Sequence, residues 1–242
     1  MKKALIALLL CACLLFPCAY AEAAVEYEPL LFTLWADNSE GYEWSCDYED
    51  NGVLQAPFVE YADTENGLGY QYSFGVQAPG RAQIVFNYGP NYALSMPERT
   101  LICSVCAEAD GSLSVRRAER YSQDHIIVVT LPSNPTTGAD WNYEEDPTGM
   151  VTLVSEEYFP LDEYLDGAGG NTEYTFRVEK SGDALLLFDY ADMWNPDAEA
   201  RETYALLVSA NDDLEISMSV DEQLFGGKDG STEPLHDGEI RN

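Results

Sequence analysis

The chain offers few side chains that could act as acids, bases or nucleophiles in a reaction. Only two of its 242 residues are histidines, His125 and His236. His125 heads an apolar segment and His236 lies in a polar C-terminal stretch, so we interpret both as structural or surface residues. Neighbours such as Glu144 and Glu145 would point to opposite faces of a strand, and we interpret them as solvated charges. The sequence contains no nucleophile elbow, phosphate loop or zinc-protease pattern. We therefore predict no catalytic residues and no enzyme.

The sequence likewise predicts no metal site and no cofactor. A calcium loop needs alternating Asp and Asn with a Gly and a Glu at fixed spacing, and no such run occurs. Three cysteines, Cys46, Cys103 and Cys106, follow residue 21, and with so few histidines they make a poor zinc site. The alternation of the strands places Cys46 and Cys103 at inward-facing positions, which favours a disulfide bond between them. An intervening strand would however hold them roughly 9 to 10 Å apart, beyond disulfide reach, so the pairing stays open.

The stretch LPSNPTTGADW, residues 131–141, predicts a stiff loop. Pro135 fixes its own φ and drives Asn134 towards an extended conformation. Gly138 permits the positive φ that reverses the chain, and the two threonines before it stand at the tip with branched side chains of low entropy. Taken alone this is ordinary turn chemistry. It is also what a loop needs in order to enter a partner without losing much entropy.

The elements that would carry this loop are strands in a long repeat. Residues 72–88 match residues 174–190 at an offset of 102, and the segment ending at Trp44 matches the one ending at Trp141 at an offset of 97. Residues 173–179 alternate polar with apolar side chains, which is typical of a strand with one buried face. Turn residues punctuate the chain, and no long window has a helical period. The predicted fold class is all-β, with two tandem immunoglobulin-like antiparallel β-sandwiches.

Four segments are expected along the chain. Residues 1–21 combine two lysines, a short apolar run and an Ala-Tyr-Ala ending, which is typical of a cleavable secretory signal, with a lipid anchor as the alternative. Residues 22–110 and 111–220 would form the two sandwiches, although residues 112–115 fit either unit. Residues 221–242 have little to bury and predict a flexible acidic tail. The protein is expected to be secreted or attached to the cell envelope.

The charge of the chain limits its partners. Removing the signal takes away Lys2 and Lys3 and no acid, so the formal net charge changes from −31 to −33. Such a field repels phosphate backbones and anionic lipid, and no later apolar stretch approaches the ~20 residues that span a bilayer. We expect no nucleic-acid partner and no membrane insertion after signal cleavage. The acids are interpreted as a solvated surface, with attraction to a cationic partner as the alternative.

Several segments of the second unit follow one another in a specific order: LPSNPTTGADW, EEYFP, GAGG at 167–170, FDYADMW ending at Trp194, and ETYALLVSAN. In order and spacing they resemble the chagasin family of cysteine protease inhibitors. The resemblance implies an immunoglobulin-like sandwich whose three loops at one end occlude the cleft of a papain-like cysteine protease. The residues that it implies for protease binding are Asn134, Pro135, Thr136, Thr137, Gly138, Gly167, Ala168, Gly169, Gly170, Asp192, Met193 and Trp194.

The sequence departs from the family pattern in both units. The family's third loop usually reads Arg-Pro-Trp, whereas Asp192-Met193-Trp194 replaces the cation by an acid, which predicts a change in potency or in the choice of target. In the first unit the first loop lacks the Pro and both threonines, and the third loop, residues 89–92, lacks the Trp. We interpret the first unit as a related sandwich, degenerate in its inhibitory loops or binding another partner. The alternative for the whole chain is an exported adhesion or carbohydrate-binding module.

Overall fold

The computed structural model describes residues 25–36, 41–64, 66–90, 96–147, 149–162, 164–165, 167–195 and 199–221. The predicted signal and residues 222–242 of the predicted tail lie outside the described residues. Within the described part the secondary structure consists of strands and one short 3-10 turn, η3, over Pro135–Thr137. The strands are β1 Leu30–Trp35, β2 Tyr42–Tyr48, β3 Phe58–Thr64, β4 Gly67–Phe74, β5 Gly80–Pro90, β6 Arg99–Ala107, β7 Leu113–Tyr121, β8 Ile126–Ser133, β9 Ala139–Asp146, β10 Val151–Pro160, β11 Gly170–Val178, β12 Gly182–Asp192, β13 Glu202–Ala210 and β14 Ile216–Val220.

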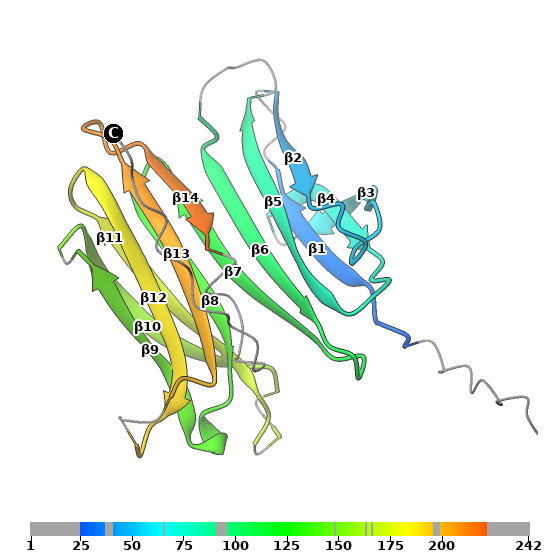
Figure 1. Cartoon of the computed structure of the whole chain (residues 1–242). Coiled ribbons are helices and arrows are strands. Elements are labelled where there is room, and N and C mark those ends of the chain that lie inside the picture. Colours follow the sequence, from blue (N-terminus) through cyan, green and yellow to red (C-terminus); the bar gives the residue numbers. More distant parts are fainter. Residues whose placement is uncertain are drawn as a thin grey trace, which may run out of the picture.

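The strands form three antiparallel sheets (Figure 1). The largest has seven strands in the order β10-β11-β8-β7-β6-β5-β2, and the two smaller sheets have the orders β1-β4-β3 and β14-β13-β12-β9. The smaller sheets cover opposite faces of the large one, as β6 shows. Leu101 and Cys103 of β6 belong to the same apolar core as Phe32 of β1, whereas Ile102 belongs to the core that contains Leu206 of β13. The predicted all-β class of antiparallel sandwiches is confirmed.

The two halves of the chain have the same strand order. The set β1-β4-β3 corresponds to β8-β11-β10, and β2-β5-β6-β7 corresponds to β9-β12-β13-β14. The halves join where β7 pairs with β8. The sequence predicts the division near residue 110, before β7. The strand correspondence groups β7 with the first half, and we therefore propose a division within residues 122–125.

The correspondence extends to hydrogen bonds of aromatic side chains. In each half an indole N–H donates to a carbonyl nine residues earlier, and a tyrosine hydroxyl donates to the carbonyl of that tryptophan. The bonds are Trp44 to Trp35 and Trp141 to Pro132, each 2.8 Å, and Tyr72 to Trp44 at 3.2 Å and Tyr174 to Trp141 at 3.1 Å. Burial raises the pKa of both tyrosines, to about 12 for Tyr72. These equivalent bonds hold the start of β2 and the start of β9 against the facing sheet of each sandwich.

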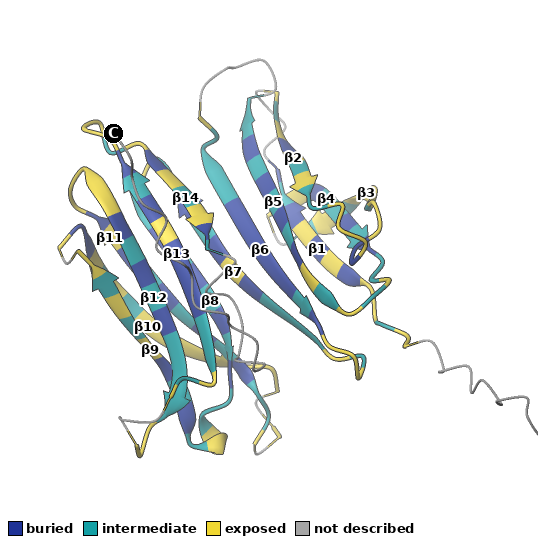
Figure 2. Ribbon diagram, viewed as in Figure 1, coloured by how far each residue is buried: buried dark blue, intermediate teal, exposed yellow. Residues whose placement is uncertain are grey.

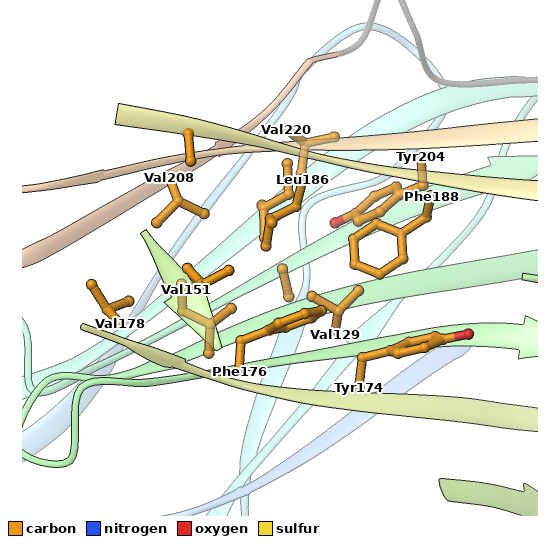
Figure 3. Packing of buried hydrophobic residues seen from close by; sticks show 14 of the residues in the cluster. Val129, Val151, Tyr174, Phe176, Val178, Leu186, Phe188, Tyr204, Val208 and Val220 are labelled. Carbon is orange, nitrogen blue, oxygen red and sulfur yellow. The ribbon is translucent and has the colours of Figure 1, made fainter. Parts of the chain in front are cut away.

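Each half encloses its own apolar core. Figure 2 shows buried residues alternating with exposed ones along the strands, which is the pattern of a strand with one covered face. In the second half Phe176, Leu186 and Phe188 are fully buried between the two sheets (Figure 3). The first half buries Phe74 and Phe86 in the same way. These cores hold the loop-bearing ends of the strands in place.

The two halves are also packed against each other. Ile102 of β6 belongs to the core of the second half, because the sheet that contains β13 and β14 extends over the first half's strands. Arg116 of β7 forms an ion pair with Glu202 of β13. Strand pairing, apolar packing and an ion pair therefore all connect the halves.

The cysteines are free thiols in the described residues. Cys46 on β2 and Cys103 on β6 are separated by β5, so the intervening strand that would prevent a bond between them is present. Burial raises the pKa of Cys46 and of Cys103 to about 12. Cys106 lies on the opposite face of β6, where its thiol is 3.2 Å from a Glu108 carboxylate oxygen.

Candidate functional site

Three connections of the second half meet at one end of its sandwich. They join β8 to β9, β10 to β11 and β12 to β13, and Figure 1 shows these strand ends together at the bottom of the view. We call residues 134–138, 167–170 and 192–194 the loop edge. All twelve residues predicted for the site lie in these three segments, so the fold brings the predicted set together.

The first segment is a turn held by its own side chains. The Asn134 carboxamide oxygen accepts hydrogen bonds from the Thr136 backbone N–H at 3.3 Å and from the Thr136 hydroxyl at 2.6 Å. The Thr137 hydroxyl donates to the Asn134 carbonyl oxygen at 2.8 Å. Gly138 ends the turn with a φ of 79°, a left-handed conformation that favours glycine. The threonine hydroxyls are thus committed to the turn, which fixes their rotamers before any partner arrives.

A hydrogen bond joins the first segment to the second. The Asn134 side-chain N–H donates to the Gly167 carbonyl oxygen at 3.3 Å. Gly167 has a φ of 83°. At Gly170 an added Cβ would clash with the Phe159 carbonyl oxygen, so no larger residue fits there without a shift of backbone. Gly167 is exposed and Gly170 is buried, so the second segment exposes main chain beside the turn at Gly167 and is packed against β10 at Gly170.

The third segment is joined to the first on its other side. The Met193 backbone N–H donates to the Gly138 carbonyl oxygen at 3.0 Å. The indole of Trp194 lies so close to Gly138 that an added Cβ would sit 3.4 Å from its ring nitrogen, yet the side chain is 83% exposed. The Asp192 carboxylate accepts a hydrogen bond from the Trp194 N–H at 3.0 Å. Asp192, which replaces the family's cation, thus shapes the turn that carries Trp194.

Two tyrosines outside the predicted set support the loop edge. The Tyr190 hydroxyl lies 3.3 Å from the Thr137 hydroxyl, and its ring packs on Trp141 at a centroid distance of 5.2 Å. The Tyr158 hydroxyl donates to the Ala168 carbonyl oxygen at 3.3 Å. Tyr190 is not singled out by the sequence analysis. Its position near the loop end of β12 is the signal that could have indicated that it reaches the turn.

Comparison with known proteins places this edge in context. A family model described as chagasin family peptidase inhibitor I42 matches residues 120–208. Chagasin from Trypanosoma cruzi is 32% identical to the chain over 90 residues, which are 36% of this chain and 82% of chagasin. The chain belongs to the chagasin family. No solved structure gives a significant match.

The match to the chagasin family covers the second half of the chain. Its residues, 120–208, include all three segments of the loop edge and the strands from β8 to most of β13. The family therefore accounts for the half in which the turn, the glycine segment and the exposed Trp194 are hydrogen-bonded together. The first half is not included in the match.

The connections that carry the loop edge of this chagasin-family chain are acidic. Residues 161–170 and 191–199 contain Asp162 and Asp192 among their acids, and no Lys, Arg or His. Exposed apolar side chains stand among the acids: Leu161, Tyr164 and Leu165, besides Met193 and Trp194. Within the described residues no group of three or more His, Cys, Asp or Glu could hold a metal ion. The same part of the chain has no helix with the length and apolar character to cross a membrane.

The strand ends of the first half that correspond to the loop edge lie at the other end of the large sheet. Strands β8, β7, β6 and β5 are successive antiparallel neighbours, so β5 runs opposite to β8. The C-terminal ends of β8 and β5 are therefore at opposite ends of the large sheet. Residues 37–40 and 91–95 of the first-half loops lie outside the described residues. Gly41, which corresponds to Gly138, has a φ of 76°.

Proposed function

We propose that the protein is an exported inhibitor of papain-like cysteine proteases, and that its second half occludes the active-site cleft of the target reversibly with the loop edge. Membership of a family of peptidase inhibitors supports the inhibitory role. The observation that carries the proposal is the hydrogen bonding of the turn to both flanking segments, through Asn134 to Gly167 and through Gly138 to Met193.

Each segment would have its own part in the complex. Residues 134–138 would lie over the catalytic cysteine and histidine of the protease, 167–170 would run as bare backbone along one side of the cleft, and 192–194 would pack on the other side. A narrow cleft needs close approach of main chain, which glycines allow. Trp194 offers the type of large rigid surface that is enriched at interface hot spots.

Preorganisation is the source of the affinity in this proposal. Ordering a loop or a side chain on binding costs roughly 0.5–1.5 kcal/mol for each immobilised side chain. The hydroxyls of Thr136 and Thr137 are already bonded within the turn, so little of this cost falls on the complex. Inhibition follows from occlusion, and no covalent bond to the protease is formed.

The test is inhibition of papain by residues 22–242. We expect tight, reversible inhibition that competes with an active-site substrate. Thr137→Arg places a long cation at the tip of the turn and should weaken inhibition by about 2 kcal/mol or more, roughly 30-fold.

The matched control for this change is Glu40→Arg, at the corresponding position of the first half and outside the described residues. We expect it to leave the inhibition constant unchanged. An equal loss in both variants would contradict the assignment of inhibition to the second half. No inhibition by the unchanged chain would instead favour an exported adhesion or carbohydrate-binding module.

A further inference from the structure

A pocket lies between the two halves, away from the loop edge. It has a volume of about 280 Å³ and opens between β14 and the strands β5, β6 and β7. Val85, Ile102 and Met218 supply apolar walls, and Asn87 and Ser219 supply polar groups. Among the described residues of its lining, Arg120 is the one that carries a charge. Apolar walls with a few polar groups are typical of sites for small molecules.

The contrast between Arg120 and Arg116 shows what is unusual about this pocket. The two arginines are four residues apart on β7, on the same face, and their exposed fractions are 2% and 4%. Arg116 has a carboxylate partner, Glu202. Arg120 donates to neutral acceptors: the Ser122 hydroxyl at 2.6 Å, the Pro97 carbonyl oxygen at 2.9 Å and the Thr100 hydroxyl at 2.7 Å. Within the described residues, no carboxylate forms an ion pair with Arg120.

A buried cation without an anion is costly. The effective penalty for removing an ion from water is several kcal/mol, and neutral acceptors offset only part of it. Burial lowers the pKa of Arg120, but a guanidinium stays charged in proteins. The guanidinium carries five N–H donors, and the three bonds above use three of them. An anion in the pocket would supply the missing charge and use the remaining donors.

We propose that this pocket binds a small organic carboxylate, whose charged end accepts hydrogen bonds from Arg120 and whose short apolar body packs against Val85, Ile102 and Met218. The apolar walls favour such a ligand over an inorganic anion, because an inorganic anion has no apolar part to pack against them. The carboxylate belongs either to a free small molecule or to an acidic side chain of residues 222–242, which follow β14. This site is independent of the loop edge and of protease inhibition.

The experiment titrates butanoate and benzoate into residues 22–242, with butanamide and benzamide as uncharged matches, at one ionic strength set with sodium chloride. Calorimetry measures the dissociation constant, and the NMR signal of the Arg120 side-chain N–H reports the site. We expect saturable binding of the carboxylates with a shift of that signal, and binding of the amides at least tenfold weaker.

Two variants locate the site. Val85→Phe fills the pocket without removing a hydrogen bond of Arg120 and should weaken carboxylate binding at least tenfold. Val128→Phe, the same change on the opposite face of the large sheet, should leave binding unchanged. Both retain Arg120, so the test does not depend on whether Arg120→Gln folds.

A chain that ends at Asp221 separates the two sources of the carboxylate. Tenfold tighter binding to this shorter chain would show that the tail's own carboxylates compete for the pocket, and unchanged binding would show that the site serves a free ligand. Equal binding of carboxylates and amides, binding unaffected by Val85→Phe, or no binding to either chain would overturn the proposal.

Discussion

The two halves of this protein share a framework and differ at their loop ends. Trp44 and Trp141 make the same hydrogen bond at the same distance, and both halves have the same strand order. The second half adds a Pro-Thr-Thr turn and Trp194, and the first half has Asn-Ser-Glu and no Trp at those positions. The comparison teaches that the residues that build the sandwich are separable from the residues that equip its edge for a partner.

The halves also differ in direction. Because β5 and β8 run opposite to each other in one sheet, the end of β5 lies at the opposite end of this sheet from the end of β8. A protease held at the loop edge would leave that end of the sheet uncovered.

Core truncation tests whether the halves are one folding unit, and it has the largest expected effect. Phe86→Ala and Phe188→Ala each remove a fully buried ring and should destabilise the protein by about 3–5 kcal/mol. Because β7 pairs with β8 and Ile102 enters the other core, both variants should unfold in a single transition by calorimetry. Two transitions, of which each variant shifts only one, would show that the halves are thermodynamically independent.

A pair of glycine substitutions separates stability from inhibition. Gly41 and Gly138 have φ values of 76° and 79°, so Ala at either should cost about 1–2 kcal/mol of folding stability through left-handed strain. Gly138→Ala also places a methyl group in van der Waals contact with the Trp194 indole. We expect it to weaken papain inhibition roughly tenfold, which is ~1.4 kcal/mol. Gly41→Ala should leave inhibition unchanged, and a comparable loss there would assign binding to both halves.

Removal of the paired tyrosine hydroxyls should have a smaller effect. Tyr72→Phe and Tyr174→Phe each delete a buried bond to a tryptophan carbonyl, which is worth about 1 kcal/mol. The loss at Tyr174 should be slightly the larger, since its hydroxyl also lies 3.4 Å from a Glu156 carboxylate oxygen. Urea unfolding measures both. A change in only one half would break the equivalence of the two frameworks.

Thiol reactivity should show the smallest change. All three cysteines after residue 21 lie in the first half, and burial raises the pKa of Cys103 to about 12. The raised pKa means that its contribution to stability is full below the ordinary thiol pKa and is lost as the pH rises towards about 12. At pH 8 Cys103 should stay unlabelled by a disulfide reagent until the protein is unfolded. Labelling of Cys103 in the native protein at the rate of a free thiol would contradict its burial.

The framework could be predicted from the sequence because it depends on local pattern. Alternation in residues 173–179 marked β11, and the 102-residue offset marked its counterpart β4. The position of the division between the halves was harder to predict. Residues 113–121 alternate in the way that either unit would require, and only their pairing with both β6 and β8 shows how the halves join.

The loop edge was predictable in its residues but not in its bonds. Pro135 and Gly138 indicated the turn, and the family resemblance indicated the other two segments. The bond from Asn134 to Gly167 joins residues that are 33 apart, and no local pattern reports such a distance. The relative direction of β5 and β8 could not be predicted either, because it depends on how many antiparallel strands lie between them.

The pairing of β7 with β8 has a consequence for solubility. In two separate sandwiches each of these strands would be an outer strand with unpaired backbone N–H and C=O groups, which invites aggregation with other chains. Here the two strands pair with each other along five residue pairs, from Arg117 with Thr130 to Tyr121 with Ile126. Cutting the chain between them to isolate the second half would uncover β8, so a truncated version would need a charged or proline-bearing edge to remain monomeric.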